Sequence, residues 1–334
     1  MAASSISLIP PGTGGVRDYA SVLSDSLGAP LLELAPHTDT TGFSGELLFL
    51  HFSGYGFQKR GVPTWLVDTV RQVRPRFDKV GIVFHELYAP YGAPWNSAFW
   101  LKGLQKRIAR ELLTLADFWI TSREESGRWL GQYSRPVPHK VMPVFSTVGE
   151  LESVDTPRKN TLVVFGSSGV RTNVYEWANG EVFRCAKRNG LQIHDIGPRI
   201  QDPVLQTRLA EEEVIVRGKL PAEEVSAALA EASYGALAYP ADYVAKSSVF
   251  AAYCAHGLCP VLLTRDYGSY DGLVANQHYA AGFGQLDAKA VQPALIGRAA
   301  RAWYEPHRVC ATQAAVKALA SEARATKEVG EASR

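Results

Sequence analysis

The chain has 334 residues, of which 46% are hydrophobic and 20% are charged. This length exceeds what a single hydrophobic core normally holds, so two domains are expected. The composition is that of a globular protein and excludes a largely disordered one. The net charge of +2 gives no support to nucleic-acid binding, and no apolar run reaches the roughly 20 residues that span a bilayer.

The first residues and the cysteines predict a cytoplasmic protein. Residues 1–12 have no cationic start and no long apolar stretch, so we expect no secretory signal. The cysteines form no CxxC pair and have no metal-ligand spacing, which favours free thiols in a reducing compartment. They are Cys185, Cys254, Cys259 and Cys310.

In the first half of the chain, short apolar runs alternate with longer segments of helical periodicity. The expected strands are residues 5–10, 46–52, 79–86 and 117–121, and the expected helices are 14–28, 62–73, 97–114 and 122–133. Ser122 and Glu125 have the spacing of a capping box at the start of the last of these helices.

A polar, turn-rich stretch, residues 145–160, is interpreted as the linker between the two domains. The alternation then restarts. The expected strands are 161–166, 191–197, 213–218, 234–239 and 260–263, and the expected helices are about 174–189, 203–212, 221–232, 247–256 and an alanine-rich segment from about 304 to 328.

Strands that alternate with helices form parallel sheets, so the sequence predicts an α/β protein with two such sheets. Ligands of open parallel sheets bind beyond the carboxyl ends of the strands. Two sheets that face each other would form a cleft between the domains. The loops that come after the strands are therefore where binding residues are expected.

The loop PPGTGGVRDYA (10–20) joins the first strand to the first helix. Its glycines allow a phosphate or a sugar to approach the helix start. The loop is not GxGxxG, because Arg17 stands at the last glycine position, and it is not a P-loop, because no Gly-Lys-Ser/Thr comes after it. A plain tight turn is the alternative interpretation.

His85 and Glu86 end the strand 79–86, where one of the two side chains should face the ligand. Zinc is disfavoured, because Ala89 stands where the second histidine of HExxH would be. A functional role and a structural role for His85 are both open.

Residues 51–66 form an aromatic, glycine-rich loop that contains Tyr55, Lys59, Arg60 and Trp65. Planar side chains stack on sugars and cations bind phosphates, which suits an acceptor-binding loop. A surface loop folded on its own aromatic side chains is the alternative.

Two loops in the second half are candidates for a diphosphate. Arg171 lies in VFGSSGVRTN (164–173), and a planar guanidinium can clamp a diphosphate. Lys246, Ser247 and Ser248 stand where a loop turns into a small-residue, apolar helix. Backbone NH groups, hydroxyls and an ammonium would converge there on an anion, which we favour over a plain serine cap with a solvated lysine.

Residues 99–112 alternate apolar side chains with four cations: Lys102, Lys106, Arg107 and Arg110. This pattern is compatible with a basic amphipathic helix on anionic lipid, although an ordinary solvated helix face is the favoured interpretation. No DxD motif occurs, so a metal-bridged nucleotide-sugar site of that type is not expected.

The chain resembles the GT-B-fold glycosyltransferases, most closely the bacterial family-4 type (glycosyl transferases group 1). The resemblance lies in the Gly-Gly-Val of residues 10–20, in VGIVFHELYAP (80–90), in VIVRGKLPAEEVSAALAEASYGALAYP (214–240) and in HGLCPVLL (256–263). The order and spacing of these segments extend over nearly the whole chain.

The resemblance implies the GT-B fold, in which two Rossmann-like parallel-sheet domains face each other across a cleft. It implies an acceptor-side domain at 1–150, a nucleotide-sugar domain at 151–303, and a C-terminal helix at 304–334 that packs back on the first domain.

The resemblance also implies roles for particular residues. Gly14 and Gly15 would approach the donor diphosphate or sugar, and His85 would lie near the donor sugar and the reacting centre. Arg171 would bind the diphosphate. The residues that flank the nucleobase would be Arg217, Gly218 and Leu220, and those that hold the phosphates would be Lys246, Ser247 and Ser248.

The sequence departs from the family's pattern at two acidic positions, which fall near Val244 and Ala252. The nearest carboxylate to the first position is Asp242, and the second normally helps to fix the nucleotide ribose. The family's lysine shortly after Arg171 is also absent. Donor orientation and a retaining outcome therefore do not follow from the resemblance alone.

The predicted function is transfer of a hexose from a UDP- or GDP-type nucleotide-diphosphate sugar to a glycan or lipid-linked acceptor, in polysaccharide or glycoconjugate synthesis. We expect a retaining, metal-independent reaction without a cofactor, in the cytoplasm or at the cytoplasmic face of the membrane, and no nucleic-acid partner. Arg171, Lys246 and helix-start NH groups would neutralise the departing diphosphate. The alternatives are a catalytically degenerate GT-B binder of sugar nucleotides or glycans, and a GT-B sugar-nucleotide epimerase.

Overall fold

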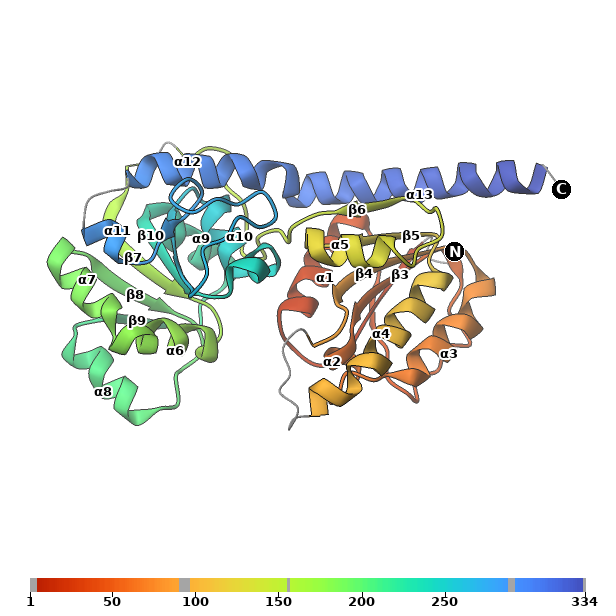
Figure 1. The fold of residues 1–334 in the computed structure, drawn as a ribbon, viewed down its shortest axis with the longest axis horizontal. Helices are drawn as coiled ribbons and strands as arrows, with labels where there is room; N and C mark the ends of the chain where they lie inside the picture. Colours follow the sequence, from red (N-terminus) through yellow and green to blue (C-terminus); the bar gives the residue numbers. More distant parts are fainter. Residues whose placement is uncertain (1–4, 90–96, 155–156, 288–291, 333–334) are drawn as a thin grey trace. The chain divides into compact units, whose positions relative to one another are not determined.

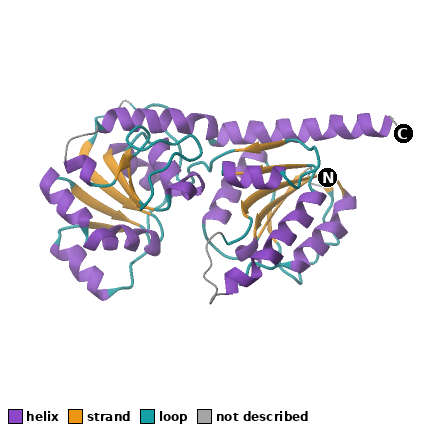
Figure 2. Ribbon diagram, viewed as in Figure 1, coloured by secondary structure: helices purple, strands orange, loops and turns teal. Residues whose placement is uncertain are grey.

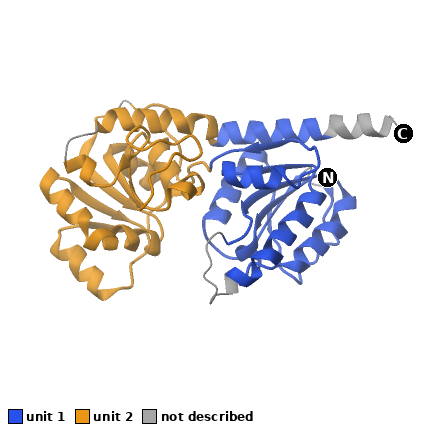
Figure 3. Ribbon diagram, viewed as in Figure 1, with its two compact units in different colours: residues 1–143, 309–334 blue, residues 144–308 orange. Residues whose placement is uncertain are grey.

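In the computed structural model, which describes residues 5–89, 97–154, 157–287 and 292–332, the chain divides into two compact units (Figure 3). Unit 1 comprises Met1–Pro143 and Val309–Arg334, and unit 2 comprises Val144–Arg308. Each unit contains its own parallel sheet.

Unit 1 is built on a six-stranded parallel sheet with the strand order β2-β1-β3-β4-β5-β6 (Figure 1). The strands are β1 (Ser5–Ile9), β2 (Leu31–Glu33), β3 (Gly45–Ser53), β4 (Phe77–Glu86), β5 (Phe118–Thr121) and β6 (His139–Val141). The helices are α1 (Gly15–Leu27), α2 (Gly54–Phe57), α3 (Thr64–Val73), the short η1 (Arg74–Arg76), α4 (Ser97–Leu115), α5 (Glu124–Gly131) and α13 (Val309–Ala332).

Unit 2 has a second six-stranded parallel sheet, in the order β12-β11-β10-β7-β8-β9. The strands are β7 (Lys159–Phe165), β8 (Gln192–Ile196), β9 (Ile215–Gly218), β10 (Ala232–Ala238), β11 (Cys259–Leu263) and β12 (Ala280–Ala281). The helices are α6 (Ser168–Glu176), η2 (Trp177–Asn179), α7 (Glu181–Asn189), α8 (Pro203–Glu211), α9 (Ala222–Glu231), η3 (Ala241–Lys246), α10 (Ser248–Ala255), α11 (Gly284–Asp287), α12 (Pro293–Tyr304) and η4 (Glu305–His307).

Helices flank each sheet (Figure 2), and this explains why the central strands are nearly continuous apolar runs. Leu48, Phe49 and Leu50 of β3 are all fully buried, and burial of each such side chain stabilises the fold by about 1.5–3 kcal/mol. Close packing also dictates Gly81, because a Cβ there would lie 2.2 Å from the ring of Phe118.

The structure corrects several local predictions. The capping box at Ser122 is absent: α5 begins at Glu124 with Arg123 as its N-cap and without a side-chain cap, because Ser122 is buried next to the end of β5. The short strands β2 and β6 were not expected, since each has only three residues.

Two predicted helices are interrupted. The helix expected at about 174–189 divides into α6 and α7, because Ala178, Asn179 and Gly180 all have positive φ. The terminal helix expected from about 304 begins only at Val309, after η4 separates it from α12. Pro306 lies in that break, and a proline cannot donate the hydrogen bond that a continuous helix requires.

The stretch 145–160, expected to be a linker, is partly integrated into unit 2. Phe145 and Ser146 are buried, and the Ser146 NH donates to the hydroxyl of Tyr304 over 2.8 Å. Residues 155–156 of this stretch lie outside the described residues, as do residues 333–334 at the end of the predicted terminal segment. The terminal helix α13 packs against α1, β4 and β5 of unit 1.

Candidate functional site

The strand orders define one topological switch point in each unit. In unit 1 it lies between β1 and β3, and in unit 2 it lies between β7 and β10. At such a point the loops after two neighbouring strands leave the sheet toward opposite faces, and the carboxyl edge of the sheet opens into a crevice that holds ligands.

At the switch point of unit 2, two helix starts meet. Ser167 caps α6 and Ser247 caps α10, and in each case the hydroxyl accepts a hydrogen bond from a backbone NH in the first turn. A Cβ added to Gly166 would lie only 3.2 Å from the side chain of Val249, which shows how closely the two starts approach. The positive ends of two helix dipoles therefore lie side by side.

The predicted phosphate-binding group lies at this point. Lys246 ends η3, is half-buried, and has its Nζ 5.6 Å from the ring centre of Tyr243. Ser247 is 7% exposed, and Ser248 is half-buried. The helix start, the ammonium and the two hydroxyls thus lie together at the β7–β10 edge.

The helix behind this group is locked onto the sheet. Every residue of α10 from Phe250 to Ala255 is buried. The hydroxyl of Tyr253 accepts a hydrogen bond from the Phe165 NH over 3.2 Å and lies 3.1 Å from the Ala236 carbonyl oxygen. Gly235 makes room for the ring, because a Cβ there would lie 2.6 Å from it. The apolar character of α10 is therefore a packing requirement.

Arg171 occupies a different position from the one that its expected role requires. Its side chain is 1% exposed and forms an ion pair with the equally buried Asp195. Its other nitrogens donate to the carbonyl oxygens of Gly166, over 3.0 Å, and of Pro198. The guanidinium faces protein oxygens and holds together the loops after β7 and β8, so the geometry supports positioning and gives no support to direct diphosphate contact.

The partner of Arg171 is itself part of a buried network. Asp195 accepts a hydrogen bond from the Tyr175 hydroxyl over 2.8 Å. Burial and, to a lesser extent, the nearby Asp195 carboxylate raise the pKa of Tyr175 well above its usual value. The phenol therefore stays protonated and donates its hydrogen bond.

Three glycines lie at the carboxyl ends of β7, β8 and β9, and the middle one, Gly197, is buried. We call Gly166, Gly197 and Gly218 the glycine shelf. A Cβ on Gly197 would lie 2.1 Å from the Gly166 carbonyl oxygen, and the Gly197 NH donates to the Gly218 carbonyl oxygen over 2.9 Å. Their φ angles are 129°, 152° and 70°, a region that favours glycine.

The shelf contains one of the three residues expected to flank a nucleobase. Gly218 belongs to it, while Arg217 is exposed on β9 and Leu220 is half-buried after it. Sequence reasoning missed Gly166 and Gly197. The available signal was that each glycine comes directly after an apolar strand.

The structure offers no carboxylate at the two acidic positions of the family's pattern. Ala252 is fully buried and Val244 is 1% exposed. The Ala252 carbonyl oxygen lies 2.8 Å from Nδ1 of His256. Asp242 is half-buried in η3.

At the switch point of unit 1, α1 begins with glycine in place of a serine cap. Gly14 is the N-cap, with φ 129° and no side-chain hydrogen bond, and Gly15 is the first helical residue. A Cβ on either would meet nothing within 4 Å. Arg17 closes the loop, because its guanidinium donates to the Gly12 carbonyl oxygen over 3.2 Å and pairs with Glu33.

His85 stands beside a second histidine that sequence reasoning missed. Nδ1 of His51 on β3 lies 3.3 Å from Nε2 of His85, and the two rings are stacked with their centres 5.5 Å apart. Tyr19 of α1 packs edge-on against His85 at 5.0 Å. The available signal was that His51 is the polar residue in the apolar run LLFLHF.

Burial keeps the side chain of His51 uncharged. His51 is fully buried, and desolvation, followed by the nearby His85, holds its pKa well below the usual value. His51 is therefore neutral, and one of the two facing nitrogens donates while the other accepts. Within the described part of the chain, Nε2 of His51 has no hydrogen-bond partner.

The proposed acceptor residues do not all face the same way. The Tyr55 hydroxyl and the Arg60 carbonyl oxygen both accept from the buried amide of Gln105, each over 3.1 Å. Lys59 and Arg60 are exposed. Trp65 packs edge-on against Phe57 at 6.0 Å and against the hydrophobic core, which leaves less of its ring for stacking on a sugar.

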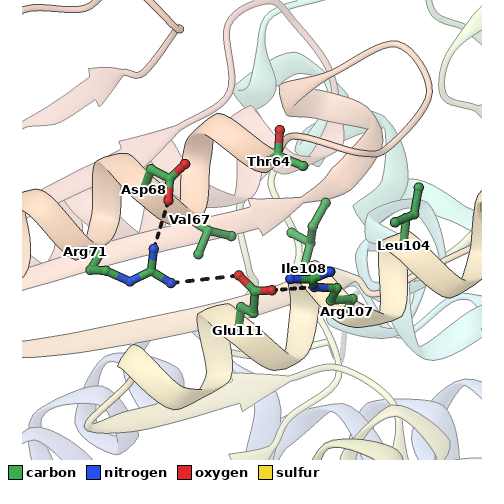
Figure 4. A pocket seen from close by; sticks show the side chains of 8 residues that line it. All are labelled: Thr64, Val67, Asp68, Arg71, Leu104, Arg107, Ile108 and Glu111. Atoms are coloured by element: carbon green, nitrogen blue, oxygen red, sulfur yellow. Dashed lines mark hydrogen bonds and ion pairs between the residues drawn. The ribbon is translucent and has the colours of Figure 1, made fainter.

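A groove of about 560 Å³ lies between α3 and α4 of unit 1 (Figure 4). Glu111 accepts a hydrogen bond from Arg107 over 2.7 Å and lies 3.8 Å from Arg71, which also pairs with Asp68 at 2.8 Å. The described residues contain no group of three or more histidine, cysteine or acidic side chains placed to hold a metal ion.

Comparison with known proteins rests on structure. No family model and no curated protein matches the sequence. The pneumococcal O-GlcNAc transferase GtfA, solved with UDP and GlcNAc, is similar with a TM-score of 0.57 and 13% identity, over 83% of this chain and 56% of its own. AviGT4, a glycosyltransferase involved in avilamycin A biosynthesis, is similar with a TM-score of 0.52 and 13% identity, over 96% of this chain and 98% of its own. The fold is GT-B.

This finding confirms the predicted fold class. A protein of Listeria monocytogenes described as a UDP-N-acetylglucosamine 2-epimerase is also similar, with a TM-score of 0.54 and 12% identity, over 86% of this chain and 87% of its own. The chain thus spans little more than half of GtfA but nearly all of AviGT4. Among the described residues of this GT-B chain, no helix is both long and apolar enough to cross a membrane.

Proposed function

We propose that the protein is a family-4-like (group 1) glycosyltransferase that takes a sugar from a nucleotide-diphosphate donor of the UDP or GDP type. The observation that carries this proposal is the pair of serine-capped helix starts at the β7–β10 switch point, with Lys246 beside them. Two helix dipoles and an ammonium form an anion site at the place where open α/β sheets bind ligands.

The chemistry of the proposed site is stabilisation of a leaving group. As the bond from the sugar to the diphosphate breaks, negative charge develops on the diphosphate oxygens. Backbone NH groups of α6 and α10 and the ammonium of Lys246 are fixed beforehand, so they stabilise this charge without reorganisation. Nothing in this arrangement requires a metal ion, and a retaining outcome is part of the proposal.

We assign Arg171 a positioning role. Its bond to the Gly166 carbonyl oxygen holds the loop that leads into α6, and its pairing with Asp195 fixes its own orientation. Gly166 and Gly218 of the glycine shelf are half-buried and suit a flat group such as the nucleobase, because the backbone can be approached closely where no side chain projects.

Unit 1 is proposed to supply the acceptor side, with His85 contacting the sugar that is transferred and Gly14 and Gly15 admitting the donor. The acceptor is proposed to be a glycan or a lipid-linked saccharide, bound near Tyr55, Lys59 and Arg60. The names of GtfA and AviGT4 support transfer to a glycoconjugate or a natural product.

Two other functions have specific support. The similarity to the protein described as a UDP-N-acetylglucosamine 2-epimerase extends over 86% of this chain, which favours epimerisation as the second candidate. The buried Ala252, at the position of the family's ribose-binding carboxylate, favours a binder that has lost turnover.

A titration with UDP and with GDP, followed by turnover of the matching nucleotide sugar, tests the proposal. We expect Lys246→Ala to weaken nucleotide binding by about tenfold, because it removes one charge from a diphosphate contact. The matched control Lys187→Ala, an exposed lysine on α7, should bind as the wild type does.

The products separate the candidate functions. Release of nucleotide diphosphate that depends on an added acceptor supports the transferase. Conversion of the donor sugar without an acceptor identifies an epimerase, and tight binding without turnover identifies a degenerate binder. Equal affinity of the wild type and Lys246→Ala would contradict the proposed site.

A further inference from the structure

The outer face of α4 in unit 1 carries large apolar side chains in contact with solvent. Trp100 is 71% exposed, and Phe99 and Leu104 are each 45% exposed. The rings of Phe99 and Trp100 pack edge-on at 5.4 Å, and Trp100 and Leu104 are one helical turn apart. Single exposed apolar residues are common, but Phe99 and Trp100 adjoin each other, and Leu104 follows one turn on where α4 lines the groove with α3, so together they form an exposed apolar patch.

Cations surround these apolar side chains. Residues 97–115 contain Lys102, Lys106, Arg107 and Arg110 but a single carboxylate, Glu111. Arg107 pairs with Glu111 at 2.7 Å. The helix therefore has a net charge of +3, all of it on the part that is not packed into the core.

The remaining cations lie over aromatic rings. The Nζ of Lys106 is 4.6 Å from the ring centre of Tyr88, and the guanidinium of Arg110 is 5.0 Å from that of Tyr133. Neither cation has a carboxylate within ion-pair distance among the described residues. Aromatic faces hold these side chains in place without neutralising them, so their charge is available to an external anion.

The groove next to this face contributes little to the attraction. Its two arginines, Arg71 and Arg107, both face Glu111, and Arg71 also pairs with Asp68 (Figure 4). Its charges are balanced within the groove. The positive potential that no described carboxylate balances comes from Lys106 and Arg110.

We propose that α4 docks unit 1 on an anionic lipid surface. Trp100, Phe99 and Leu104 would enter the headgroup region, where tryptophan is favoured, and the cations would lie among the lipid phosphates. Each basic residue near such a surface strengthens binding by about fivefold. An aliphatic side chain beside two aromatic ones suits acyl chains better than the stacked bases of a single-stranded nucleic acid. This proposal does not depend on glycosyl transfer.

Cosedimentation of the full chain with vesicles tests the proposal. We compare phosphatidylcholine alone with phosphatidylcholine that contains about 30% phosphatidylglycerol, at low and high salt. The protein should sediment with the anionic vesicles at low salt, lose much of this binding at high salt, and bind neutral vesicles at least about tenfold more weakly.

Two variants separate the apolar and the electrostatic contributions. Phe99→Ser/Trp100→Ser removes apolar groups that already face solvent, and Lys106→Gln/Arg110→Gln removes two charges. Each should weaken binding to the anionic vesicles by about tenfold or more. Only the second should reduce the dependence of binding on salt. An unchanged thermal midpoint establishes that each variant is folded.

The matched controls lie on other surfaces. Leu295→Ser changes a leucine that is 50% exposed on α12, and Lys140→Gln/Lys187→Gln removes two exposed lysines on β6 and α7. Both should bind vesicles as the wild type does. The proposal is wrong if the wild type does not bind anionic vesicles, or if the controls lose as much binding as the α4 variants. It is also wrong if a single-stranded oligonucleotide binds this face and anionic vesicles do not displace it.

Discussion

The switch points of the two units differ in the polar groups that lie beyond their central strands. In unit 2, serine hydroxyls cap the helices that start beside β7 and β10, and Lys246 lies next to them. In unit 1, α1 starts at Gly14 with no side-chain cap, and the polar groups nearby are the buried, neutral His51 and, beside it, His85. Two sheets of one architecture thus carry different groups at their switch points: a lysine beside two serine-capped helix starts in unit 2, and two facing histidines in unit 1.

The largest effect is expected from removing Arg171, the buried cation beside the unit 2 switch point. Arg171→Leu leaves Asp195 buried and without its counter-charge, so we expect the free energy of unfolding to fall by about 3–5 kcal/mol. Urea denaturation measures this loss in the free energy of unfolding. The control Tyr175→Phe removes one hydrogen bond to the same carboxylate and should cost about 1–2 kcal/mol. A loss below about 1 kcal/mol for Arg171→Leu would mean that the network is not what holds these loops.

Acid titration tests a feature that the units share, a buried neutral histidine in each. Burial lowers the pKa of His256 in unit 2 to about 4, and it lowers the pKa of His51 in unit 1. Between a pH of about 4, the pKa of folded His256, and the ordinary histidine pKa of about 6.5, the unfolded chain binds a proton at His256 and the folded chain does not. Stability should therefore fall as the pH falls through this range, by about 3 kcal/mol for His256.

The measurement is the free energy of unfolding between pH 7 and pH 4.5 or so. In His256→Gln, an amide can keep the contacts to Ser226 and the Ala252 carbonyl oxygen but binds no proton, so the slope with pH should decrease by up to about one proton. His37→Gln, at an exposed histidine, should leave the slope unchanged. An equal slope in all three proteins would show that His256 is not the group responsible.

Two glycines with the same φ differ in how crowded their surroundings are. Gly14 in unit 1 and Gly166 in unit 2 have the same φ of 129°. A Cβ on Gly14 meets nothing within 4 Å, whereas one on Gly166 lies 3.2 Å from Val249 and 3.3 Å from Val170. Gly14→Ala should cost backbone strain alone, about 1–2 kcal/mol, and Gly166→Ala about 1 kcal/mol more because of crowding. Thermal denaturation of both variants checks the order, and the reverse order would contradict it.

The smallest effect concerns the two serine caps. Ser247→Ala should reduce stability by about 1 kcal/mol, because the hydroxyl that accepts from the Phe250 NH is 7% exposed. Ser167→Ala should cost about half as much, because Ser167 is exposed and water can replace its hydroxyl. Chemical denaturation resolves the difference, and equal losses would show that burial does not distinguish these two caps.

Much of the fold could be predicted because parallel sheets leave a strong local signal. Residues 48–52 and 80–84 of two such apolar runs are buried on both faces, and glycine ends helices such as α1 and α7. The helix breaks at Ala178 and Pro306 were missed because the surrounding helical pattern outweighed them, although positive φ in the first case and a proline in the second interrupt the helix locally. The strands β2 and β6 were missed because three residues carry too little periodicity.

The candidate site was predicted only in part. Lys246, Ser247 and Ser248 were found because a polar group before an apolar helix is a local pattern. The burial of Arg171 could not be found in this way, because Asp195 and Pro198, which engage it, are more than 20 residues away in the sequence. His51 did carry a local signal, as the polar residue of an apolar run, but its pairing with His85 on the neighbouring strand could not be predicted from a local pattern.

Local sequence patterns were enough to predict two α/β halves, the loops at the ends of their strands, and the polar start of an apolar helix. These features are local, because hydrophobic period and turn residues act over a few neighbouring positions. Tertiary packing determines which of those polar residues remain near solvent and which are buried and engaged in hydrogen bonds or ion pairs within the protein. A side chain's role depends on what the sheet brings beside it, and strand pairing joins residues that no local pattern connects.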